Sequence, residues 1–215
     1  MRKYNVSSNE SCFGFLKKGK IMDKIILTRF KDLSESAKKV AISNMRDRAE
    51  YINMVLKVTR VFARCELDNM GIDTDSMVQF SVGLQCIRDD VKRKGTIDLS
   101  INIGCFEKEI NVEIMKVLRD LSDDDSISDD ELADVEYVDV AYSTSDIVTN
   151  LEPCGLIFGD GRYLDEWLQT TTLGLFTELH QRVEEFYNAC FTDGMVSTYL
   201  AGRNPECLSD GRLVG

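Results

Sequence analysis

The residues in this sequence best suited to chemistry are carboxylates, and they are concentrated in one stretch of the chain. From Asp120 to Gly161 there are thirteen Asp and Glu residues and no Lys or Arg. Acids at this density favour attraction to a basic surface, and carboxylates are also common ligands of hard cations. The candidate binding residues are eight acids in the first part of the stretch: Asp123, Asp124, Asp125, Asp129, Asp130, Glu131, Asp134 and Glu136.

The net charge of the whole chain follows from this stretch. The sequence has 26 basic and 37 acidic residues, a net charge of −11, so 24 acids (37 − 13) face 26 basic residues elsewhere. The rest of the chain is therefore close to neutral, and the negative field is concentrated in one segment. Such a field disfavours direct binding of nucleic acid over that face and favours a protein partner with a basic surface.

Three other features could carry chemistry, but each has a simpler interpretation. His180 is the only histidine, and no nucleophile can be named beside it. Asp73 and Asp75 have the spacing of two cation ligands but lack the other residues of a calcium loop. The Gly-Asp-Gly triplet at 159–161 indicates a tight turn, because it lacks the lysine and hydroxyl of a phosphate-binding loop. We therefore expect no catalytic residues, no metal site and no cofactor.

The seven cysteines indicate a reducing compartment. Their number is odd, their spacings are wide and no CxxC pair is present, so we expect free thiols that pack as small hydrophobic side chains. No apolar run approaches the roughly 20 residues of a membrane-spanning helix. The first residues also lack the apolar core of a secretory signal. We expect a cytoplasmic location and no membrane contact.

The element expected at the centre of the fold is a β-hairpin at about 76–106. Apolar and polar residues alternate in two runs, which is the pattern of a sheet with one buried face. A charged turn from Arg88 to Thr96 joins the runs, so an antiparallel pair is predicted. The predicted buried face carries Val78, Phe80, Val82, Leu84 and Cys86 from the first run and Ile97, Leu99, Ile101, Ile103 and Cys105 from the second.

Two long helical segments, at about 32–70 and 163–191, are predicted to pack on this hairpin. Apolar residues recur in both at helical spacing. The first opens at Asp32, which has capping-box spacing to Glu35, or at Ser34. Its length leaves open whether it is one helix or two with a break near residue 48.

A shorter, one-sided helix at about 107–121 is expected to lie across the apolar face of the hairpin. The fold class is therefore α+β, with an antiparallel sheet built on the central hairpin and packed by helices.

The acidic stretch is predicted to be an excursion from the domain at 120–161. Residues 123–130 lack bulky side chains and are expected to form an exposed loop. A third strand is predicted at 135–142, which 147–148 extends.

One domain is expected to span 22–215. Short apolar runs predict an edge strand at 25–27 and a terminal strand after Gly202. Residues 1–21 are basic and are expected to be a flexible extension, with Met22 as an alternative start.

Both ends of the sequence resemble small acidic proteins encoded by tailed bacteriophages. The run from Phe30 to Ala41 matches a phenylalanine followed by Leu-Ser-x-x-Ala-Lys-x-x-Ala, and Met70-Gly71-Ile72 matches a motif before a strand. Near the other end are paired glutamates and aromatics at 184–187, a helix start at 192–194, and Asp-Gly-Arg at 210–212.

The middle of the chain departs from that family. Its members often carry Ser-Gln-Gly-Asp-Gly after the first strand, where residues 81–85 here read Ser-Val-Gly-Leu-Gln. The resemblance implies a phage origin and an α+β fold, but no established activity.

Three functions are consistent with these features. The first is a non-enzymatic protein that binds a host protein, in its sharpest form an anti-defence inhibitor whose carboxylates imitate the phosphates of nucleic acid. The second is a metal-dependent hydrolase or nuclease that uses clustered carboxylates. The third is a structural or virion assembly protein, and the sequence leaves homo-oligomerisation open. We favour the first, because the acids lie in a single run and no catalytic set can be named.

Overall fold

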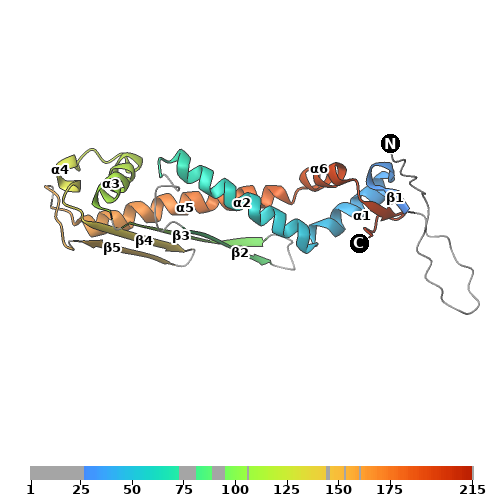
Figure 1. The fold of residues 1–215 in the computed structure, drawn as a ribbon, viewed down its shortest axis with the longest axis horizontal. Helices are drawn as coiled ribbons and strands as arrows, with labels where there is room; N and C mark the ends of the chain where they lie inside the picture. The colour runs from blue at the N-terminus through green and yellow to red at the C-terminus, as the bar shows by residue number, and fades with distance from the viewer. Residues whose placement is uncertain are drawn as a thin grey trace, which may run out of the picture.

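The structure, a computed structural model, is elongated, and its helices and its main β-sheet run along the same long axis (Figure 1). It describes residues 27–72, 81–88, 95–105, 107–143, 146–152, 154–159 and 161–214. The extension predicted at 1–21 and the pair Asp73 and Asp75 lie outside these residues. None of the described helices is both long enough and apolar enough to cross a membrane.

The main sheet has four antiparallel strands in the order β2-β3-β4-β5. β2 (Ser81–Arg88) and β3 (Gly95–Cys105) form the predicted hairpin, in which Leu84 lies opposite Leu99. Positions 76–80 of the predicted hairpin, positions 89–94 in its charged turn and Phe106 lie outside the described residues. β3 also pairs with β4 (Tyr137–Ser143), and β4 pairs with β5 (Asp146–Glu152). The sheet is therefore built from two consecutive hairpins.

The second hairpin corrects one prediction. Residues 147–148 were expected to extend the strand at 135–142, but the chain reverses after Ser143 and they belong to a separate strand. Both strands alternate between the two faces of the sheet, as period-two patterning requires. The buried side chains on their inner face are Val138, Val140 and Tyr142 from β4, and Ile147 and Leu151 from β5.

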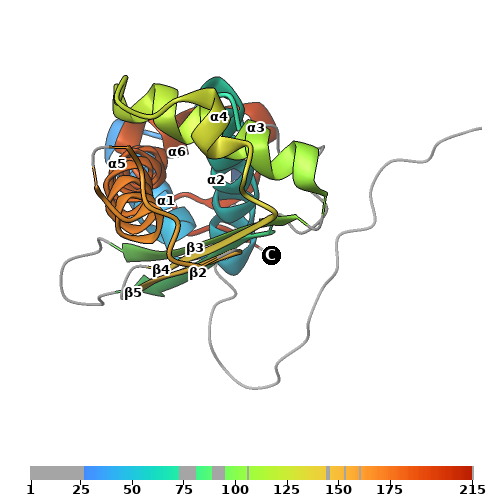
Figure 2. The ribbon, with the colours of Figure 1, turned by 90° about the vertical axis from the view of Figure 1, so that its left-hand side faces the viewer.

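Helices cover one face of this sheet, as the view along the molecule shows (Figure 2). They are α2 (Ala49–Asn69), α3 (Lys108–Ser122) and the 27-residue α5 (Leu164–Cys190), so the predicted helices at 107–121 and 163–191 are confirmed. This arrangement is the α+β fold expected from the sequence.

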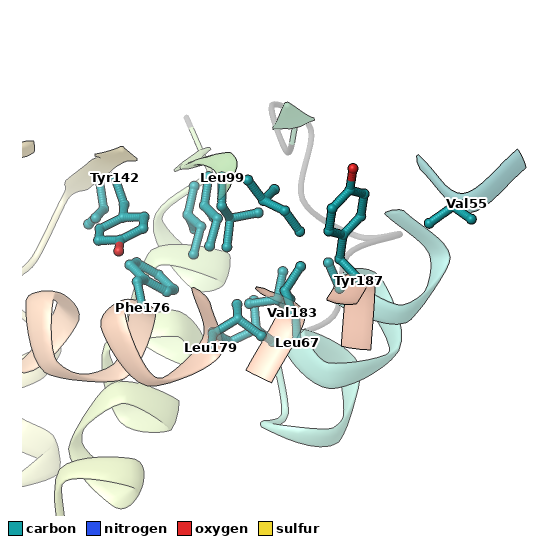
Figure 3. Packing of buried hydrophobic residues seen from close by; sticks show 14 of the residues in the cluster. Val55, Leu67, Leu99, Tyr142, Phe176, Leu179, Val183 and Tyr187 are labelled. Atoms are coloured by element: carbon teal, nitrogen blue, oxygen red, sulfur yellow. The ribbon is translucent and has the colours of Figure 1, made fainter. Parts of the chain in front are cut away.

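The core lies between the inner face of the sheet and α5. Figure 3 shows Leu99 and Tyr142 of the sheet facing side chains of α5 that include Phe176, Leu179 and Val183. All five are buried, and Leu99, Phe176 and Val183 are fully so. Burying a side chain of this size stabilises the fold by roughly 1.5–3 kcal/mol. The contacts along α5 therefore supply much of the force that holds the two layers together.

The predicted segment at 32–70 is two helices. α1 (Glu35–Arg46) and α2 are separated at residues 47–48. The capping box predicted for Asp32 and Glu35 is wrong, because Asp32 belongs to a short 3₁₀ helix, η1 (Phe30–Asp32). Instead, Ser34 caps α1, and its hydroxyl accepts a hydrogen bond from the Ala37 amide at 3.3 Å.

One part of the apolar pattern of α2 does not enter the core. Val58, Val61 and Cys65 belong to the predicted apolar series of this helix, but all three are exposed, and Val61 is 61% exposed. The buried positions of α2 recur every four residues, at Tyr51, Val55, Thr59, Ala63 and Leu67. The expectation that the thiols pack as small hydrophobic side chains is therefore wrong for Cys65, and also for Cys154, which is exposed, whereas Cys190 and Cys207 are buried thiols.

The far end of the molecule brings the two ends of the described chain together (Figure 1). β1 (Leu27–Arg29) pairs antiparallel with β6 (Glu206–Leu208), and α6 (Asp193–Arg203) packs against α1. Residues 27–51 and 190–214 form what we call the terminal end, where the Tyr51 ring contacts Phe191 and Tyr199. β1 and β6 form a small sheet of their own, separate from the main one. β1 shares only Leu27 with the strand predicted at 25–27, whose other two residues lie outside the described part of the chain.

Candidate functional site

The eight predicted binding residues lie at the opposite end of the elongated molecule, around α3 and α4 (Figure 1). We call residues 119–136, together with 154–159 and 161–171, the acidic end. The exposed loop expected at 123–130 is confirmed only in part: residues 123–128 form a loop, but Ile127 is buried and a short helix, α4 (Asp129–Leu132), begins at Asp129. The side chains of Leu132 and Val135 are buried as well. These three apolar residues hold the segment against the rest of the fold.

A capping box organises the start of α4. The Ser128 hydroxyl accepts a hydrogen bond from the Glu131 amide at 3.3 Å, and the Glu131 carboxylate accepts one from the Ser128 amide at 2.8 Å. The other oxygen of Glu131 accepts a hydrogen bond from the Gly159 amide at 2.6 Å. Glu131 therefore ties α4 to the loop before α5, and its carboxylate is occupied within the fold.

Arg119, the residue just before the acidic stretch, turns back onto it. Its guanidinium donates to the Asp129 carboxylate at 2.5 Å and to the Ile127 carbonyl oxygen at 3.3 Å. It also contacts Asp120 at 3.1 Å, and the Lys116 ammonium lies 3.7 Å from Asp129. The charge of Asp129 is therefore largely compensated by side chains of α3.

Arg162, the first basic residue after the stretch, does the same from the other side. Its two terminal nitrogens lie 2.9 and 3.3 Å from the two carboxylate oxygens of Asp124, a bidentate pair. The guanidinium also donates to the Ser126 hydroxyl at 2.5 Å and lies 5.7 Å from the centre of the Phe158 ring. Asp124 is thus held between the end of α3 and the start of α5.

These contacts lower the pKa of each engaged acid. The pKa of Asp124 falls because Arg162 and then Ser126 donate to its charged form. The pKa of Asp129 falls because Arg119 donates to it and Lys116 adds an attractive charge. The pKa of Glu131 falls because the amides of Ser128 and Gly159 donate to it. All three carboxylates are therefore ionised at neutral pH.

The remaining five predicted binding residues face solvent. They are exposed, and within the described part of the chain they form no side-chain hydrogen bond or ion pair: Asp123, Asp125, Asp130, Asp134 and Glu136. The structure therefore divides the eight predicted residues into three that stabilise the acidic end and five that leave negative charge on its surface.

Two of the three acids that stabilise the acidic end, Asp129 and Asp124, are held by arginines that the sequence prediction missed. Arg119 and Arg162 immediately flank the run without basic residues, and that position is the signal that could have pointed to them. The capping box of Ser128 and Glu131 also has a local signature, a serine followed three residues later by a glutamate.

The other sequence candidates do not join this site. The His180 ring lies between α5 and the sheet, where Nε2 donates to the Ile97 carbonyl oxygen at 2.9 Å and Nδ1 accepts from the Tyr142 hydroxyl at 3.4 Å. His180 thus links the two layers of the fold. Within the described ranges, no group of three or more His, Cys, Asp and Glu side chains is placed to hold a metal ion.

Comparisons with known proteins give no match: no protein-family model, no curated protein and no solved structure matches this chain. The function therefore has to be argued from the residues at the acidic end.

Proposed function

We propose that this chain is a non-enzymatic binding protein whose acidic end recognises a basic surface on another protein. The observation that carries the proposal is the set of five exposed carboxylates at one end of an elongated molecule, without a compensating cation among the described residues. Concentrated negative charge steers a basic partner into contact and sets the orientation of the complex.

The engaged acids support this proposal indirectly. Asp124, Asp129 and Glu131 fix the backbone of the segment that carries the exposed acids, through contacts to Arg162, Arg119 and the Ser128 amide. A charged surface on a fixed backbone loses less conformational entropy on binding than the same charges on a mobile loop. The acidic end therefore suits recognition of a specific basic surface.

The resemblance to acidic phage proteins extends the proposal to the identity of the partner. The partner would be a bacterial host protein in the cytoplasm. If that host protein normally binds nucleic acid, the exposed carboxylates would occupy the positions of phosphates, and the chain would act as an anti-defence inhibitor.

Two matched triple variants test the proposal. The first, Asp125→Asn with Asp130→Asn and Asp134→Asn, neutralises three exposed acids of the acidic end. The second, Asp32→Asn with Glu109→Gln and Glu113→Gln, neutralises three exposed acids elsewhere. Each changes the net charge from −11 to −8 (−11 + 3), so a difference between them reports position and not total charge.

The measurement is capture of proteins from a bacterial lysate at several salt concentrations, followed by mass spectrometry. We expect the same partner with the wild-type chain and the second variant, and its loss with the first. Recovery should also fall as salt rises, because screening weakens exposed charges. Equal recovery by both triple variants would reject the proposal. A rise in melting temperature with Mg²⁺ or Mn²⁺ that the first triple variant abolishes would instead favour the metal-dependent enzyme.

A further inference from the structure

A pocket of about 410 Å³ opens at the acidic end, between the start of α5 and the segment after α3. Its floor is one face of α5, since Tyr163, Trp167 and Thr171 recur at helical spacing. Its wall includes Asp124, which Arg162 holds in place. The volume of this open pocket is large enough to admit a long side chain.

The charge of the pocket is set by Glu166. Asp124 and Arg162 compensate each other through their bidentate pair, whereas the exposed Glu166 carboxylate has no hydrogen bond or ion pair within the described residues. The lining therefore carries one uncompensated negative charge. The exposed Asp123 and Asp125, on either side of Asp124, add to the negative field around the opening.

Two of the residues that form the floor of the pocket are aromatic. Tyr163 is 47% exposed, while Trp167 is only 6% exposed and packs edge-on against Phe158, with ring centres 6.0 Å apart. An exposed aromatic face beside a free carboxylate suits a cation that is planar and donates several hydrogen bonds. A guanidinium meets both conditions, because it stacks on aromatic rings and donates to carboxylates in its own plane.

We propose that this pocket receives an arginine side chain of the basic partner. The guanidinium donates to Glu166 and lies against the Tyr163 ring, and the flanking acids attract the positive segment that carries it. This inference rests on the proposed function, because it names the group on the partner that the acidic end recognises. The ligand of the pocket is then a positively charged side chain of another protein, so a free anion should not bind there.

The chain contains its own reporter for this pocket, because Trp167 is its only tryptophan. The probe is a tri-arginine peptide amide. The controls are the tri-lysine and tri-citrulline peptide amides of the same length. We expect the arginine peptide to change the Trp167 emission in a saturable manner, the lysine peptide to bind more weakly, and the citrulline peptide to have no effect. Inorganic phosphate should also leave the emission unchanged, and a saturable change with phosphate alone would overturn the proposal.

Variants separate binding in the pocket from general attraction to an acidic protein. Glu166→Gln should raise the Kd of the arginine peptide by about tenfold, the loss expected for one charge-assisted hydrogen bond. Glu113→Gln removes the same charge from an exposed position of α3 outside the pocket and should change the Kd by less than about twofold. Tyr163→Leu, a second pocket variant, should remove the preference for arginine over lysine.

The results also distinguish this inference from the proposed function. If Glu166→Gln and Glu113→Gln bind the arginine peptide equally, or Trp167 does not respond, the pocket inference is overturned. If the triple variant of the acidic end still loses its partner in that case, the proposed function stands without the pocket. If the pocket variants lose the peptide but the triple variant keeps its partner, the pocket stands and the proposed function fails.

Discussion

The two ends of this molecule are held together by different interactions. At the acidic end, arginines bind carboxylates that lie at or near the surface, as in the pair of Arg162 and Asp124. At the terminal end, aromatic side chains surround Tyr51, whose ring centre lies 4.9 Å from that of Tyr199 and 5.7 Å from that of Phe191. The Tyr51 hydroxyl is buried and donates to the Cys190 carbonyl oxygen at 2.6 Å.

This difference shows that one end of the molecule contributes more to stability, whereas the other end carries the exposed charge. Buried rings contribute through apolar burial and do not depend on salt, whereas exposed ion pairs contribute roughly 0–1 kcal/mol each and are screened. The terminal end can therefore stabilise the fold without placing charged groups on the surface for a partner to bind. The acidic end keeps its shape at a modest gain in stability and leaves five carboxylates available to a partner.

The largest expected effect comes from a glycine at the terminal end. Gly211 has φ +93°, and a Cβ there would overlap the carbonyl oxygen of Ala37 in α1. Gly211→Ala should lower the free energy of unfolding by about 4 kcal/mol, measured by chemical denaturation. Gly155 at the acidic end has a similar φ, +78°, with no atom near its Cβ position, so Gly155→Ala should cost only about 1 kcal/mol. Equal losses would show that the close approach to α1 is not what constrains Gly211.

The next effect concerns the Tyr51 hydroxyl. Tyr51→Phe should lower the free energy of unfolding by about 1–2 kcal/mol, because the buried Cys190 carbonyl oxygen loses its donor. Tyr163→Phe, which removes an exposed hydroxyl at the acidic end, should have no measurable effect. If both variants lost the same stability, the contrast between the two ends would be wrong.

The same tyrosine predicts an alkaline limit. Burial, and then the neighbouring Cys190 and Tyr199, raise the pKa of Tyr51 from 10.0 to about 12. The unfolded chain ionises at the lower value, so the contribution of Tyr51 is complete below pH 10 and is lost as the pH rises toward about 12. As the pH rises across this range, the melting temperature of Tyr51→Phe should therefore fall less steeply than that of the wild type.

A smaller effect is expected for the ion pair at the acidic end. Asp124→Asn should lower the free energy of unfolding by about 1 kcal/mol, because the bidentate contact to Arg162 is lost. Since folding lowers the pKa of Asp124 from 3.8, its contribution is present above that value and is lost as the pH falls below it. The difference from the wild type should therefore shrink in acid. Asp125→Asn, one residue away and exposed, is the control and should leave the free energy of unfolding unchanged.

The smallest effects are expected at two serine caps, one at each end. Ser34→Ala should cost about 0.5–1 kcal/mol in global unfolding, because α1 has twelve residues and buries four of them. Ser128→Ala should leave global unfolding unchanged and speed hydrogen exchange at the Glu131 amide, since the four-residue α4 buries only Leu132. A global loss with Ser128→Ala would mean that α4 itself unfolds together with the core.

Much of the fold could be predicted because its signals are local. Alternation placed the hairpin of β2 and β3, and helical spacing placed α3 and α5. The break between α1 and α2 could not be decided, because the apolar spacing continues through it. The pairing of β1 with β6 could not be predicted either, since strands of three residues carry no register signal and lie at opposite ends of the described chain.

For the candidate site, the sequence by itself determined how much charge there is and where along the chain it lies. The side-chain types alone determine this, because the number of ionisable groups and their positions along the chain do not depend on how the chain folds. Only the tertiary structure decided which carboxylates remain open to a partner. Arg162 can reach Asp124 only once the start of α5 meets the segment after α3, and Arg119 can reach Asp129 only because the chain turns back after α3. Electrostatic attraction of this kind depends on distance in space. The opening beside Glu166 exists for the same reason, since its floor and its wall come from segments far apart in the sequence.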